Sequence, residues 1–226
     1  MTTPSPTRRL RREAWGFAVG SLCFLAGSLP FYAAWAGAVG TNTTFFVGSI
    51  FFTLAAFIQL SLSGRRLPRG EMSAPDRADW WAAAIQFAGT LLFNVSTGVA
   101  LAAAIAQPDA VGVGWVPDAW GSVAFLVSSA LAVVATKDRG LLWDCDARTW
   151  HGTVLNFLGS VAFGISAVGA YVSPSTGDLV NEEWANGGTA IGAVCFFVAA
   201  LLSRRTIPRE EPRHVRGEDG DSARGG

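Results

Sequence analysis

The sequence predicts an all-α membrane protein with six transmembrane helices, arranged as three repeated two-helix hairpins with both termini inside (N-in/C-in). Three observations lead to this class: long windows without charged residues, basic residues confined to one side of those windows, and one short motif found in every window. The chain of 226 residues is 50% hydrophobic and only 15% charged. This composition is typical of membrane proteins and excludes a disordered chain.

The charge-free windows are each long enough to cross a bilayer as a helix, which takes about 17–25 residues. They cover residues 14–38, 44–63, 80–106, 119–136, 150–173 and 186–203. The predicted organisation is a basic cytoplasmic segment (1–13), a transmembrane domain (14–203) with hairpins 14–63, 80–136 and 150–203, and a cytoplasmic tail (204–226). The tail is rich in Pro, Gly and charged residues, so we expect it to be disordered.

The distribution of Lys and Arg predicts the orientation. All 17 lie before the first window, between the second and third, between the fourth and fifth, or after the sixth. The other three connections, the first of which is "GTNTT" at 40–44, contain none. Because basic loops are retained in the cytoplasm, we expect a multi-pass protein of the plasma membrane with both termini cytoplasmic.

Each window contains the same motif: Gly, then Ser, Thr or Ala, an aliphatic residue, any residue, and Phe. The motif glycines are Gly20, Gly48, Gly89, Gly121, Gly159 and Gly192. Motifs of the odd-numbered windows recur at nearly constant spacing, so we expect three hairpins inserted in the same direction around a pseudo-threefold axis. Since small residues let helices approach closely in lipid, we interpret these glycines as helix-packing residues. The alternative is a ligand groove lined by glycine.

The first hairpin, "GSLCFLAGSLPFY…TFFVGSIFFTLAAFIQL", resembles the YrhK-like domain, a short two-helix membrane unit of bacterial proteins. The resemblance continues through "QFAGTLLFNVST" and "PDAWGSVAFLVSS" in the second hairpin, and only the Gly-Ser and Phe positions persist in the third. That family carries no assigned reaction or catalytic residues. The resemblance therefore implies a bacterial membrane architecture and no particular site.

Amide side chains occur inside several windows. Gln86 and Asn156 each lie three residues before a motif glycine, at equivalent positions of two hairpins, whereas Asn94 lies deeper. A buried amide needs a partner. One hypothesis is a polar cavity that opens to the cytoplasm and binds a neutral or zwitterionic solute, lined by Gln59, Gln86, Thr90, Asn94, Asn156 and Ser160. The alternative, which we favour, is that these side chains form hydrogen bonds between helices.

Other chemistry finds little support in the sequence. No window contains Asp, Glu, Lys or Arg, the charged residues that proton-coupled and ion-driven carriers ordinarily need, and the loop "WDCDARTWH" at 143–151 matches no strong metal-binding pattern. We expect no enzymatic activity, no cofactor, no metal site and no nucleic-acid partner. The predicted partners are the lipid bilayer and either a second copy of the chain or another membrane protein. The predicted function is a structural or partner-binding membrane module, and the alternative is a small channel or facilitator for a neutral solute.

Overall fold

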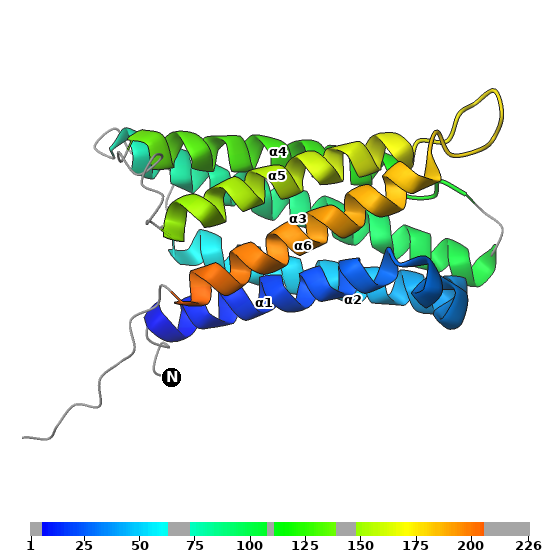
Figure 1. Ribbon diagram of the computed structural model, residues 1–226, viewed down its shortest axis with the longest axis horizontal. Helices are drawn as coiled ribbons and strands as arrows, with labels where there is room; N and C mark the ends of the chain where they lie inside the picture. The colour runs from blue at the N-terminus through cyan, green and yellow to red at the C-terminus, as the bar shows by residue number, and fades with distance from the viewer. Residues whose placement is uncertain (1–5, 63–72, 108–110, 139–147, 206–226) are drawn as a thin grey trace, which may run out of the picture.

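The computed structural model describes residues 6–62, 73–107, 111–138 and 148–205, and these residues form six α-helices (Figure 1). The helices are α1 (Pro6–Gly27), α2 (Pro30–Leu62), α3 (Ala74–Ala106), α4 (Trp115–Asp138), α5 (Arg148–Gly169) and α6 (Glu182–Arg205). The predicted all-helical class is confirmed. Within the described ranges, α2 to α6 are long and apolar enough to cross a membrane. The tail predicted at 204–226 lies almost entirely outside the described residues.

The first connection differs from its prediction. The window 14–38 is not one helix, because α1 ends at Gly27 and α2 begins at Pro30. Proline has no N–H to donate and disfavours helical geometry in the residue before it, so the chain turns here. The prediction of a loop at 40–44 is wrong. These residues lie within α2, where Asn42 and Thr43 donate side-chain hydrogen bonds to the carbonyls of residues 38 and 39, at 2.9 and 2.7 Å.

A second break occurs inside α2. Gly37 has φ 68° and ψ 176°, a left-handed conformation that glycine adopts without steric cost. It separates a short helical segment, which begins at Pro30, from the long apolar helix that follows. α2 is therefore helical on both sides of the kink at Gly37, and no extended loop occurs between Pro30 and Leu62.

Other helices extend beyond the charge-free windows because polar residues cap them. Ser73 precedes α3, and its hydroxyl oxygen accepts a hydrogen bond from the backbone N–H of Asp76 at 3.3 Å. Asn181 precedes α6 in the same way, and its Oδ1 accepts from the N–H of Trp184 at 2.8 Å. Both interactions satisfy N–H groups that a helix start leaves without a partner.

The described helices form a closed ring. Each helix contacts its neighbours along the chain, and α1 contacts α6. The helices run along one common direction, and the start of α1 lies at the same end of the bundle as the end of α6 (Figure 1). We call this end, which carries the arginines of α1, the basic end.

Phenylalanine rings fill the interior of this ring of helices. All six come from the repeated motif, and each is at most 5% exposed: Phe24, Phe52, Phe93, Phe125, Phe163 and Phe196. The ring centroids from α1, α3 and α5 lie 5.9–6.2 Å apart, and those from α2, α4 and α6 lie 5.7–6.4 Å apart. Two three-membered layers of rings therefore cross the bundle axis. We call them the phenylalanine cluster.

The motif glycines lie where the two helices of a hairpin approach each other. They face one another in pairs: Gly20 with Gly48, Gly89 with Gly121, and Gly159 with Gly192. At five of them, an added Cβ would lie 3.0–3.3 Å from the carbonyl oxygen of the partner glycine; at Gly89 it would lie 2.8 Å from the Phe125 ring. Larger side chains would push the helices apart, and the phenylalanine cluster depends on their close approach.

Candidate functional site

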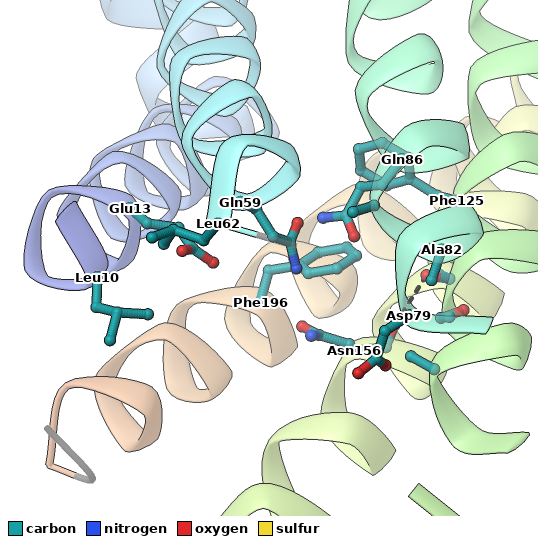
Figure 2. A pocket seen from close by; sticks show the side chains of 14 residues that line it. Leu10, Glu13, Gln59, Leu62, Asp79, Ala82, Gln86, Phe125, Asn156 and Phe196 are labelled. Carbon is teal, nitrogen blue, oxygen red and sulfur yellow. Dashed lines mark hydrogen bonds between the residues drawn. The ribbon is translucent and has the colours of Figure 1, made fainter. Parts of the chain in front are cut away.

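A cavity of about 270 Å³ lies on the bundle axis between the basic end and the phenylalanine cluster (Figure 2). Leu10 of α1 and Leu62 of α2 line it near the basic end, and the rings of Phe125 and Phe196 bound it on the inside. Every one of the six helices contributes to its wall. Four of the predicted substrate-binding residues line it: Gln59 of α2, Gln86 of α3, and Asn156 and Ser160 of α5.

Helix-to-helix hydrogen bonding orients Gln86. The hydroxyl of Ser128 in α4 donates to the carbonyl of Ala82 at 2.7 Å and also lies 3.3 Å from Gln86 Oε1. The amide nitrogen of Gln86 is thereby directed toward the cavity (Figure 2). In α5, the hydroxyl of Ser160 donates to the backbone carbonyl of Asn156 at 2.8 Å, so it offers the cavity an oxygen acceptor.

Thr90 and Asn94, the other two predicted substrate-binding residues, do not line this cavity. Thr90 is fully buried, and its hydroxyl donates to the carbonyl of Phe87 within α3 at 2.7 Å. Asn94 follows Phe93 of the phenylalanine cluster and points at a neighbouring helix, where its Nδ2 donates to Thr53 Oγ1 of α2 at 2.8 Å. Asn94 thus connects α2 to α3 beside the phenylalanine cluster and does not line the cavity.

The cavity is also lined by two carboxyl side chains that the sequence analysis did not predict as site residues. Glu13 of α1 and Asp79 of α3 lie on opposite sides of it (Figure 2). Each is the residue directly before a charge-free window. Both therefore lie outside the predicted transmembrane windows, which contain no charged residue. Burial raises the pKa of Glu13 to about 7. An acidic residue at the basic boundary of an odd-numbered window was the signal available in the sequence.

The electrostatic character of the cavity follows from these groups. Its described lining holds two carboxyl groups, three amides and hydroxyl oxygens, and no Lys, Arg or His. Such a surface accepts hydrogen bonds and favours positive charge. Across the described residues, no three His, Cys, Asp or Glu side chains come together as metal ligands. Most of the loop at 143–151 lies outside the described ranges.

Comparisons with protein-family models, with curated proteins and with solved structures found no match. The resemblance of the hairpins to the YrhK-like domain stays a prediction. Function must therefore be inferred from the geometry of the bundle and its cavity.

Proposed function

We propose that this chain is a structural or partner-binding module of a bacterial plasma membrane, without catalytic activity. It has six membrane-spanning helices in three hairpins, with both termini cytoplasmic. The apolar outer surface supports this proposal: Leu54, Val95 and Ile191 are 55%, 55% and 61% exposed and would contact lipid. In α1, the apolar stretch begins at Ala14, after the arginines and Glu13, and continues through the turn into α2.

The phenylalanine cluster is the main observation in favour of a module that does not conduct solutes across the membrane. A solute moving along the bundle axis would have to pass two layers of buried rings whose centroids lie about 6 Å apart. A polar solute would lose its hydrogen bonds to water there and find no replacement, at a cost of about 2–7 kcal/mol for each polar group. The axis is thus closed to hydrophilic solutes.

The axial cavity favours a second candidate, a facilitator for a small neutral solute. Gln59, Gln86 and Asn156 supply hydrogen-bond donors and acceptors to the cavity. The cavity is on the basic side of the phenylalanine cluster, so transport would require the rings to separate. The second candidate therefore depends on a conformational change, whereas the first does not.

Solute flux into proteoliposomes separates the two candidates. The panel would include urea, glycerol and small sugar alcohols, with protein-free liposomes as the baseline and a known pore protein as the positive control. We expect no flux above the baseline. Saturable flux that Gln86→Leu abolishes, in a variant that still elutes as a folded protein, would overturn the non-conducting proposal. Asn94→Leu is the matched control, because Asn94 does not line the cavity.

A further inference from the structure

The axial cavity has the features of a binding site rather than a packing defect. Its volume of about 270 Å³ is close to the lower end, about 300 Å³, of ordinary small-molecule pockets. Side chains from all six helices converge on it, and its polar groups come from α1, α2, α3, α4 and α5. A void formed by imperfect packing of lipid-facing helices would have apolar walls, because unpaired polar groups are costly there.

The carboxyl groups define the charge that the cavity accepts. Among the described residues, the carboxyl group of Glu13 has no hydrogen-bond or ion-pair partner, although it faces the cavity. Asp79 adds a second carboxyl on the opposite side (Figure 2). A cation placed between them would be attracted by both, and it would lower the raised pKa of Glu13 by stabilising the charged carboxylate.

The rest of the lining suits an alkylammonium group. An ammonium has three N–H donors and no acceptor, and the amide oxygen of Asn156 lies between the two carboxyl groups in the view of Figure 2, with the amide of Gln59 beside it. The alkyl part would lie against Leu10, Leu62 and the alanines of α3. The rings of Phe125 and Phe196 close the inner side of the cavity.

We infer that the axial cavity binds a small aliphatic amine in its cationic form, held by Glu13, Asp79 and the surrounding amides. Two carboxyl groups on opposite sides favour a linear diamine over a monoamine. This inference goes beyond the proposed function, because equilibrium binding from the basic end requires no passage through the phenylalanine cluster. Absence of binding would leave the non-conducting proposal standing, and measured flux would leave this inference standing.

Calorimetric titration of the full chain in non-ionic maltoside micelles tests the inference. The probes are butylamine and the diamine putrescine, with butanol and butyrate as neutral and anionic controls of the same carbon skeleton. We expect saturable binding of both amines, tighter for putrescine, and none of butanol or butyrate. Absence of saturable amine binding, or equal binding of butanol, would overturn it.

Substitutions assign the binding to this cavity. Glu13→Gln keeps the size of the side chain and should weaken butylamine binding about tenfold or more, the loss of one charge-assisted hydrogen bond. Glu183→Gln is the matched control; Glu183 is an exposed acid in the first turn of α6, at the opposite end of the bundle, and its substitution should leave the affinity unchanged. If Glu13→Gln fails to fold, Asp79→Asn makes the same comparison. Unchanged affinity in the folded variant would refute the assignment.

The same ammonium chemistry is present in a free amine and in a phosphatidylethanolamine headgroup. Nanodiscs of phosphatidylglycerol, with and without phosphatidylethanolamine, distinguish these sources. If the phospholipid raises the apparent Kd for butylamine, the headgroup occupies the cavity; if the Kd is unchanged, the occupant is a free amine. Either result supports an ammonium site, provided that butylamine binding is lost in Glu13→Gln.

Discussion

Two adjacent glycines of α6 offer a direct measurement of how closely the helices pack. A Cβ added at Gly188 would lie 2.6 Å from the carbonyl oxygen of Ala162 and 2.7 Å from the backbone nitrogen of Ser166, both in α5. A Cβ added at Gly187 would meet no atom within 4 Å. Gly188→Ala and Gly187→Ala therefore change the same helix by the same atoms, and only one of them forces α5 and α6 apart.

The expected change in the free energy of unfolding is the sum of two opposing contributions. Replacing Gly by Ala inside a helix stabilises it by about 0.8–1 kcal/mol, and this term is common to both variants. Overpacking costs about 1–3 kcal/mol, and only Gly188→Ala incurs it, because backbone atoms cannot rotate away as a side chain does. Separation of the helices would also lengthen the hydrogen bonds that Ser166 Oγ makes to Ala185 O and Thr189 Oγ1, at 2.6 and 2.7 Å.

Reversible unfolding in mixed micelles, followed by far-ultraviolet circular dichroism, gives the free energy of unfolding of each variant. We expect Gly187→Ala to be as stable as the unchanged protein or up to about 1 kcal/mol more stable. Gly188→Ala should be about 1–3 kcal/mol less stable than Gly187→Ala. Equal free energies of unfolding for the two variants would refute the close contact between α5 and α6.

Two further substitutions test the interior of the bundle. Phe52→Ala removes a ring that is 1% exposed and should lower the free energy of unfolding by about 3–5 kcal/mol. The control Phe31→Ala removes a ring that is 72% exposed and should change the free energy of unfolding by at most about 0.5 kcal/mol. Similar losses for the two variants would contradict the central position of Phe52. A double-mutant cycle of Asn94→Leu with Thr53→Val should give a coupling free energy of about 0.6 kcal/mol, and zero coupling would contradict the hydrogen bond between them.

The sequence predicted the elements of this fold better than their connections. Apolar content identifies membrane-length helices because transfer of a side chain into hydrocarbon depends mainly on that side chain. The first connection was missed because polar residues normally mark loops. Asn42 and Thr43 instead satisfy their polar groups on carbonyls of their own helix, while Pro30 and Gly37 bend the chain.

The candidate site was predicted in part. Equivalent positions in two hairpins led to Gln86 and Asn156, which share the cavity. Asn94 was grouped with Gln86 because they lie on one helix face, but Asn94 lies at the depth of the phenylalanine cluster, outside the cavity lining, and binds Thr53 instead. Glu13 was missed because a charge just outside a window gives no information about the direction of its side chain.

The sequence by itself determined the helical class, the apolar lengths of five helices, and the motif that recurs in every window. These properties are local: they depend on composition and on spacing along one helix. Only the tertiary structure decided that α6 meets α1, that six motif phenylalanines meet on one axis, and that the carboxyl group of Glu13 faces the amides of other helices. The physical reason is that helix rotation and depth are set by packing against neighbours, and hydropathy does not specify either of them.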